Sequence, residues 1–595
     1  MRYSRVKSAM TAAFVLTCVV TAAVPAERSW AGDVGAAVGA TDLPEVTPQQ
    51  GSALVDLART AMTDYLHVRA APSSVRIPPQ LRELVRRPNA VAVTLRRGGS
   101  VMAMEVHSAE DLCTNLIIAA LQAMRSPKLP DRVDDKVLAG LTVEVEVLGK
   151  PLPIDQGQVD RAVVPGLTGL QCGSGSSTVH VLPSAAYVLG LSPEEMLGKT
   201  MQQLQGPAES QLPPGKTNLQ LAVFAARHYV GYPDSPAFEL HRGKLSPTPP
   251  RLDDKAALAA AASVGRYLAE HQEADGWFTV GEGETTLVDQ LYATWALARL
   301  AARQPAPALA ESVRRALAGA GRKVARNQGR AVVKAGSPDD SLAATALLAL
   351  AMETDRTKQA VELRRELLAG LTANLDAPAT RPGAGPATSA AARRHGVTRG
   401  RCLAAMALAT DPACEPFLAS ARREMLVARP ASAEEALWKF RAVPGLAWPI
   451  DFGDPNAAVG LTQHGQGVPG WGAGQPTSAG TPKPQQGQAI PADDRGGFAA
   501  GAQPPDTYLT GLAAMCLVKL LDRPANPPYM ASWYARQLAD ARGFCANMVY
   551  QPMEAYFAAD PNSWAGAVRA APGSAAATAP ACAAAIEALI LTWEP

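Results

Sequence analysis

Residues 292–302 read YATWALARLAA, and residues 343–352 read AATALLALAM. Three later segments have the same character: GRCLAAMALA at 400–409, LTGLAAMCLVKL at 509–520 and CAAAIEALIL at 582–591. Each is apolar almost all round at helical periodicity, which is typical of a helix buried on every side. Alanine favours helix and lets neighbouring helices pack closely. The five segments therefore predict buried helices throughout the C-terminal part of the chain.

These segments recur at a spacing near fifty residues. Steps of 51, 57, 108 and 72 residues separate the aligned positions Thr294, Thr345, Cys402, Thr510 and Cys582. The long third step leaves room for a sixth helix near Ala433–Phe440 and for a Gly-, Pro- and Gln-rich insertion at 443–505. Amphipathic stripes lie between the buried segments, at Ala257, Ala261, Val264 and Leu268 and at Leu309, Val313, Leu317, Ala320 and Val324. Alternating amphipathic and buried helices predict a two-helix repeat.

Two local motifs connect this repeat to a known family. Residues 272–277 read QEADGW, which looks like a glutamine-to-tryptophan repeat motif, and Gly496-Gly497-Phe498 is followed by Asp506-Thr507-Tyr508-Leu509-Thr510. Over about 253–595 the chain resembles the α/α toroid of squalene–hopene cyclases and protein prenyltransferase β-subunits. The resemblance implies an all-α ring of about five to six helix pairs.

The chemistry of that family depends on residues that this sequence lacks. Leu509 stands where the prenyltransferase resemblance implies a zinc-binding histidine, and leucine has no donor atom for a metal. The cyclase motif Asp-x-Asp-Asp is absent; Asp339-Asp340 and Asp493-Asp494 are the nearest acidic pairs. Ser337-Pro338 precedes the first pair, so we expect its acids to serve a helix N-terminus. The second pair lies among glycines and prolines, and we expect it to be solvated.

The N-terminal part has mixed strand and helix patterns. Val91, Val93 and Leu95 predict a half-buried strand, and residues 141–147 predict a second strand with Glu144 and Glu146 facing outward. Ser108 with Asp111 predicts a capped helix start, as does Ser192-Pro193-Glu194-Glu195. Strands and short helices without regular parallel crossovers indicate an α+β fold.

This part also resembles a family. From about 51 to 235 it looks like the AMMECR domain, through LARTAMTDYL (57–66), AVAVTLRRGGSVMAMEV (90–106), LTVEVEVLG (141–149), VVPGLTGLQC (163–172) and VHVLPSAAYVLGLSPEEML (179–197). The resemblance implies an α+β fold with a poorly defined role. Met102, Ala103, Met104, Glu105 and Val106 stand where the family has Arg-Gly-Cys-Ile-Gly, so a site built on that motif is in doubt.

The remaining features predict the localisation of the protein and its domain boundaries. Basic residues, an apolar stretch from about Ala9 to Pro25 and small residues predict a cleaved signal peptide over 1–31 and hence a periplasmic or secreted protein, with an uncleaved anchor as the alternative. We divide the rest into an AMMECR-like domain (45–240), a Pro-rich linker (241–252) and a toroid (253–595). The linker predicts that the two halves fold independently.

Cysteines outside the signal are sparse, odd in number and without CxxC pairs, which fits buried thiols with one or two disulfides.

Composition limits the function without naming it. The chain has 56 Lys and Arg against 54 Asp and Glu, a net charge of +2, so nothing in it indicates nucleic acid or, after signal cleavage, a stable membrane span. We expect no cofactor and no metal.

The leading hypothesis is an exported binding or scaffold protein for a small molecule, a glycan or a protein. The alternative is a toroid enzyme acting on an isoprenoid or a polysaccharide. The candidate ligand-contacting residues are Asp289, Tyr292, Trp295, His464, Trp471, Asp506 and Tyr508, with core packing as the alternative for the aromatic ones.

Overall fold

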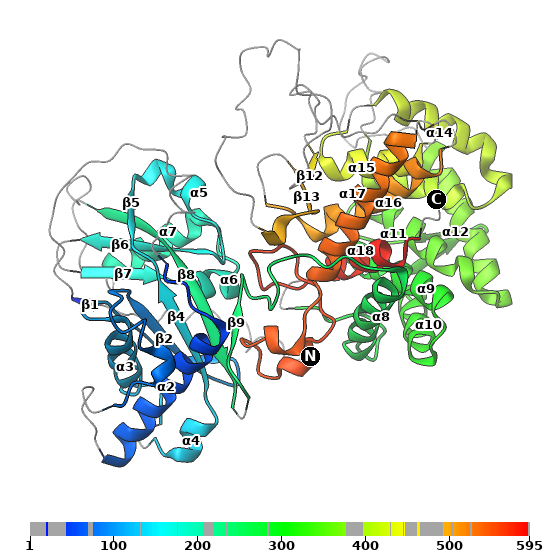
Figure 1. Ribbon diagram of the computed structural model, residues 1–595. Helices are drawn as coiled ribbons and strands as arrows, with labels where there is room; N and C mark the ends of the chain where they lie inside the picture. The colour runs from blue at the N-terminus through cyan, green and yellow to red at the C-terminus, as the bar shows by residue number, and fades with distance from the viewer. Residues whose placement is uncertain are drawn as a thin grey trace, which may run out of the picture.

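The structure is a computed structural model in two parts (Figure 1). It describes residues 20–21, 43–68, 75–130, 133–174, 177–205, 219–233, 235–281, 285–376, 397–428, 430–443, 446, 461–463, 492–500, 504–523, 526 and 528–592. His464, Trp471 and all of the predicted signal peptide except Val20–Thr21 lie outside these residues.

The N-terminal part is built on an antiparallel sheet, in which nine strands are described. Seven follow the order β1-β7-β6-β8-β4-β2-β3, while β5 and β9 both pair with β8. The long strand β8 changes neighbours half-way, from β5 and β6 to β4 and β9. The strands are β1 (Val20–Thr21), β2 (Val91–Arg97), β3 (Ser100–His107), β4 (Thr142–Leu148), β5 (Leu152–Ile154), β6 (Thr168–Ser174), β7 (Ser177–Val181), β8 (Gln220–Gly231) and β9 (Phe238–Leu240).

Helices cover this sheet on both faces. On one face α2 (Pro48–Val68) and α3 (Leu112–Ala123) pack over β2, β4 and β8, with α4 (Asp135–Ala139) beside α2. Near β6 and β7 lie α5 (Val159–Ala162), α6 (Pro183–Leu189) and α7 (Pro193–Gln205). Antiparallel strands with helices on their faces form the predicted α+β arrangement.

Three sequence predictions for this part differ from the structure. Glu144 and Glu146 do not face outward: each is about 1% exposed. Strand β2 is likewise buried on both faces, not half-buried, because α6 and a segment of the helical part cover the second face. The helix predicted to start at Ser108 begins later, since Asp111 accepts the amides of Cys113 and Thr114 as the N-cap of α3.

The helical part is a closed ring. Six described helices each pack against the next, and the last returns to the first. They are α9 (Leu287–Arg303), α11 (Pro338–Ala351), α13 (Arg399–Leu408), α15 (Ala433–Ala442), α16 (Thr507–Leu521) and α18 (Ala579–Ile590). All six coincide with the buried helices predicted from sequence, the one near Ala433–Phe440 included.

Outer helices surround this ring, each against an inner partner. They are α8 (Asp254–Glu270), α10 (Pro307–Gly321), α12 (Lys358–Asp376), α14 (Glu415–Val427) and α17 (Pro528–Asn547). Short hairpins pair β10 (Val324–Asn327) with β11 (Arg330–Val333) and β12 (Leu461–Gln463) with β13 (Phe498–Ala500). Val324, predicted to extend the stripe of α10, therefore lies in a strand.

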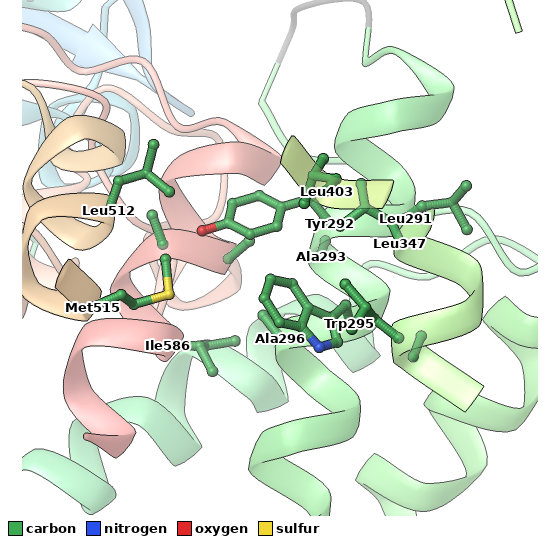
Figure 2. Packing of buried hydrophobic residues seen from close by; sticks show 14 of the residues in the cluster. Leu291, Tyr292, Ala293, Trp295, Ala296, Leu347, Leu403, Leu512, Met515 and Ile586 are labelled. Atoms are coloured by element: carbon green, nitrogen blue, oxygen red, sulfur yellow. The ribbon is translucent and has the colours of Figure 1, made fainter. Parts of the chain in front are cut away.

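Aromatic and aliphatic side chains fill the centre of the ring. Figure 2 shows Tyr292 and Trp295 extending from α9 toward Leu512 and Met515 of α16 and Ile586 of α18. Tyr292 is fully buried and Trp295 nearly so. Small residues let the inner helices approach closely: a Cβ on Gly511 of α16 would lie 2.4 Å from the carbonyl oxygen of Ala584 in α18.

The two parts share a buried polar junction, and the orange-red segment that follows α17 lies between them (Figure 1). Fully buried Arg569 donates to the Tyr187 hydroxyl at 2.7 Å, to the Gly243 carbonyl at 2.8 Å and to Glu554 at 3.0 Å. Arg242 donates to Asp493 at 3.1 Å and to Asp494 at 2.7 Å, in the short helix η8 (Ala492–Asp494). The prediction that these two acids are solvated is therefore wrong. Both are buried, and Arg242 and Lys244 of the 241–244 turn supply the positive charges that pair with them.

Candidate functional site

The N-termini of the inner helices gather at one end of the ring. The side chain of Asp289, in the first turn of α9, lies near that of Arg399, the first residue of α13. Arg399 in turn lies near Glu434 in the first turn of α15. Glu434 contacts Tyr508, the second residue of α16. Four helix starts therefore converge on one patch of charged and aromatic side chains, which we call the mouth cluster: Asp289, Arg399, Glu434 and Tyr508.

Arg399 is the centre of the mouth cluster. Its Nη2 lies 3.8 Å from Asp289 Oδ1 and its Nε lies 3.6 Å from Glu434 Oε1. Both distances allow ion pairing but exceed those of hydrogen bonds. Neither nitrogen has a hydrogen-bond partner among the described residues, although both atoms are buried. The edge of the guanidinium that pairs with planar or bidentate acceptors is thus without hydrogen bonds there.

Glu434 is held by two donors. The Tyr508 hydroxyl donates to Glu434 Oε1 at 2.6 Å, and the indole Nε1 of Trp438 lies 3.3 Å from the same oxygen. That indole is also 3.2 Å from the Tyr508 hydroxyl oxygen. The guanidinium carbon of Arg399 lies 5.8 Å from the centroid of the Tyr508 ring, within cation–π range. These contacts fix the positions of the phenol and of the carboxylate.

The mouth cluster is open to solvent in part. The side chains of Asp289, Arg399 and Glu434 are 18%, 23% and 32% exposed. Burial acts to lower the pKa of Arg399, but Tyr508, Glu434 and Asp289 outweigh it and raise the pKa, so the guanidinium stays charged. Burial raises the pKa of Tyr508, so the phenol stays protonated. The patch offers two carboxylate acceptors, a phenol and a cation whose Nε and Nη2 make no hydrogen bond to the part of the chain that the structure describes.

The structure brings several of the predicted residues to this end of the ring. Asp289 and Tyr508 belong to the mouth cluster, and Asp506 is the N-cap of α16, where its carboxylate accepts the amide of Leu509 at 2.8 Å. Burial raises the pKa of Asp506. Tyr292 and Trp295 lie deeper in the core, with the Tyr292 ring 5.8 Å from that of Tyr508 and 6.0 Å from that of Trp295. Packing accounts for the positions of these last two side chains.

Sequence reasoning missed Arg399 and Glu434. Thr398 and Ser432 cap the helices that carry them, so Arg399 is the first residue after a cap and Glu434 the second. Such positions usually serve the helix dipole, and arginine is unfavourable there. An arginine at the first position of a helix was therefore the available signal.

A second charged group lies farther along the inner helices. Arg441, on the last turn of α15, is 5.3 Å from the Trp295 ring centroid and 4.9 Å from that of Trp438. Arg299 of α9 pairs with Glu587 of α18, which is fully buried. Cation–π contacts and an ion pair thus stabilise the ring where it is otherwise apolar.

The N-terminal sheet carries a further buried cluster. Glu144 pairs with Arg96 and with His228, whose Nε2 lies 2.9 Å from Glu144 Oε2. Glu146 accepts the Ser184 hydroxyl at 2.5 Å, and burial raises the pKa of this carboxyl. Tyr556 of the helical part covers the group, with its ring 5.3 Å from the Arg96 guanidinium carbon. The cluster is closed to solvent and helps to join the two parts.

Other site types find no support in the described residues. No group of three or more His, Cys, Asp or Glu side chains there has the geometry to hold a metal ion. The seven cysteines of the described ranges are buried and form no disulfide. None of the helices described combines the length and apolar content needed to cross a bilayer.

Comparisons with known proteins identify no family. No family model matches the sequence, and no curated protein matches it. Among solved structures, an uncharacterized protein from Pyrococcus horikoshii is 23% identical and covers 33% of this chain and 98% of its own, with a TM-score of 0.29. A family 76 glycoside hydrolase from a bovine Bacteroides thetaiotaomicron strain is 9% identical and covers 76% of this chain and 95% of its own, with a TM-score of 0.28. At such TM-scores neither likeness supports an activity.

Proposed function

We propose that this chain is an exported binding protein and that the mouth cluster binds a polyhydroxylated ligand of the carbohydrate class. Carboxylates accept hydrogen bonds from sugar hydroxyls, and a guanidinium donates to them. An aromatic ring beside such polar groups offers a face for the apolar side of a sugar ring. The observation that carries the proposal is Arg399, whose buried Nε and Nη2 have no hydrogen-bond partner among the described residues.

Binding accounts for the cluster better than hydrolysis does. Hydrolysis of a glycoside needs one carboxyl that holds a proton beside one that does not. Asp289 and Glu434 instead both lie within ion-pair distance of the same guanidinium. We therefore assign both carboxylates the role of hydroxyl acceptors.

One observation favours the enzyme as a second candidate. Burial raises the pKa of Asp506, and the negative charge of Glu434 acts in the same direction. A buried carboxyl with a raised pKa is the kind of group that general acid catalysis uses. On this alternative, Asp506 would protonate the leaving group of a polysaccharide, or an isoprenoid alkene.

Titration calorimetry with three soluble probes tests the binding proposal: maltohexaose, a glucosamine hexamer and hexagalacturonic acid. We expect the wild-type protein to bind at least one of them and Arg399→Met to weaken that binding about tenfold or more. Arg314→Met is the matched control, because Arg314 lies exposed on α10 and pairs with Glu311 of its own helix. Its affinity should equal that of the wild type.

Two outcomes would overturn the proposal. The first is no heat of binding with any of the three probes. The second is binding that Arg399→Met leaves unchanged. Chromatography of the same mixtures tests the enzyme alternative. If cleavage products form with the wild type but not with Asp506→Asn, the protein is a hydrolase and the binding proposal is wrong.

A further inference from the structure

Asp339 of α11 reaches across to the start of the neighbouring inner helix. Its Oδ1 accepts the Thr398 hydroxyl, and its Oδ2 accepts the backbone amide of Gly400 at 3.2 Å. Thr398 and Gly400 are the residues on either side of Arg399. One carboxylate therefore holds the chain on both flanks of the central residue of the mouth cluster.

The two helices are in close contact at this point. A Cβ on Gly400 would lie 2.5 Å from the backbone oxygen of Asp339 and 2.5 Å from its Oδ1. Only glycine therefore fits at position 400 without displacing α11. Thr398 is fixed from both sides, because its hydroxyl oxygen also accepts the amide of Arg401 at 3.2 Å as the N-cap of α13.

The neighbouring acid, Asp340, contacts the N-cap of its own helix instead. Ser337 is the N-cap of α11, where its hydroxyl accepts the amide of Asp340 at 3.0 Å and donates to the Asp340 carboxylate at 2.7 Å. The cap predicted from sequence is thus confirmed for Ser337 and Asp340. Asp339 was expected to serve the same cap, but its carboxylate bonds to α13 instead.

We propose that Asp339 is a positioning residue for Arg399, with Thr398 and Gly400 as the contacts through which it acts. The inference rests on the proposed function for its biological meaning but not for its test. Arg399 has no described hydrogen bond from Nε or Nη2 to fix its side chain. Its guanidinium meets Asp289, Glu434 and the Tyr508 ring only while the backbone at 398–400 stays in place. Side chains that orient a binding residue in this way act through geometry.

The rate at which phenylglyoxal modifies Arg399, followed by peptide mass spectrometry, reports the position of the guanidinium without any ligand. We expect Asp339→Ala to raise this rate constant about threefold or more, because freeing residues 398–400 exposes the side chain. Asp340→Ala is the matched control: it weakens the cap of α11 but leaves the Asp339 contacts in place, so the rate at Arg399 should not change. Circular dichroism establishes that each variant is folded.

Asp339→Asn is the milder variant, to be used should Asp339→Ala fail to fold. Its amide keeps one acceptor oxygen but cannot accept from both Thr398 and Gly400, so we expect a smaller rise in the same direction. A rate at Arg399 that is the same in the wild type and in every folded Asp339 variant overturns the inference.

Binding of the probe that the wild type prefers separates this inference from the proposed function. We expect Asp339→Ala to weaken binding about tenfold and Asp340→Ala to leave it unchanged. A faster modification of Arg399 in a protein that binds no oligosaccharide would refute the function but support the positioning role. Loss of binding in Arg399→Met with wild-type behaviour in Asp339→Ala would support the proposed function but refute the positioning role.

Discussion

At the scale of single residues, Glu144 and Glu146 show that two like side chains on one strand can have opposite roles. Glu144 forms the ion pair with the buried Arg96 guanidinium, and it also pairs with His228. Burial acts to raise its pKa, but Arg96 and His228 outweigh it and lower the pKa, so this carboxyl is ionised. Burial instead raises the pKa of Glu146, which favours its neutral form.

This difference predicts unequal effects of the same substitution. We expect Glu144→Gln to lower the free energy of unfolding by about 3–5 kcal/mol, because it leaves Arg96 buried without a counter-charge. Glu146→Gln keeps an acceptor for the Ser184 hydroxyl and removes no needed charge, so we expect a loss of about 1 kcal/mol or less. Urea unfolding of the two variants measures both values. Equal losses would contradict the assignment of charge.

At the scale of elements, the β2–β3 hairpin is shaped by its contact with the helical part. Both turn residues are glycines with positive φ, +52° at Gly98 and +75° at Gly99. A Cβ on Gly99 would lie 2.2 Å from the carbonyl oxygen of Phe557, whereas nothing lies within 4 Å of one on Gly98. The tip of this hairpin therefore touches the segment that follows η9 (Pro552–Glu554).

The two glycines form a matched pair for substitution. Gly98→Ala meets only the backbone cost of a positive φ, about 1 kcal/mol. Gly99→Ala meets a similar cost and must also push the Phe557 carbonyl away, so we expect it to destabilise the protein by about 2 kcal/mol more. Thermal unfolding compares them. A Gly99→Ala variant no less stable than Gly98→Ala would show that the hairpin does not contact the helical part in solution.

At the scale of the whole molecule, a buried lysine lies in the junction between the two parts. Lys244 has no exposed surface, and its Nζ lies 3.4 Å from Asp493 Oδ2. Arg242 and His241 share the same carboxylate, and Asp494 and Arg569 act on the lysine from farther away. Burial lowers the pKa of Lys244 to about 7, with Arg569 and Arg242 acting in the same direction and Asp493 and Asp494 against it.

This lowered pKa makes the junction sensitive to pH. Between pH 7 and the usual lysine value, the unfolded chain binds a proton at Lys244 that the folded protein does not, so stability rises with pH there. We expect the free energy of unfolding of the wild type, measured relative to that of Lys244→Met, to increase from pH 7 to pH 9. Urea titrations at several pH values give this difference. A difference that is flat or falls over the same range would show that Lys244 is charged in the folded protein.

The junction also bears on the division into domains. Independent folding of the two halves stays a prediction from the Pro-rich linker. The structure adds that Arg569 and Tyr187 would each lose a buried partner on separation. We therefore expect any isolated half to be less stable than the same half in the full chain.

The sequence alone was sufficient to predict the helical ring and the mixed class of the N-terminal part. Apolar periodicity locates buried helices such as α9 and α11 because burial on every side leaves few polar positions in the sequence. Capping side chains likewise locate helix starts at Ser192 and Ser337, because a cap is a contact between residues close in sequence. Tyr508 could be named as a candidate because the sequence places this aromatic residue on an inner helix.

Only the tertiary structure could reveal which polar residues are buried and which meet. Glu144 and Asp493 read as solvated because their burial comes from partners far along the chain, Arg96 for the first and Arg242 for the second. Arg399 and Glu434 meet Asp289 and Tyr508 only once the ring closes and brings the starts of α9, α13, α15 and α16 to one end. Local periodicity determines the elements, but contacts between distant residues depend on how those elements pack, and the candidate site consists of such contacts.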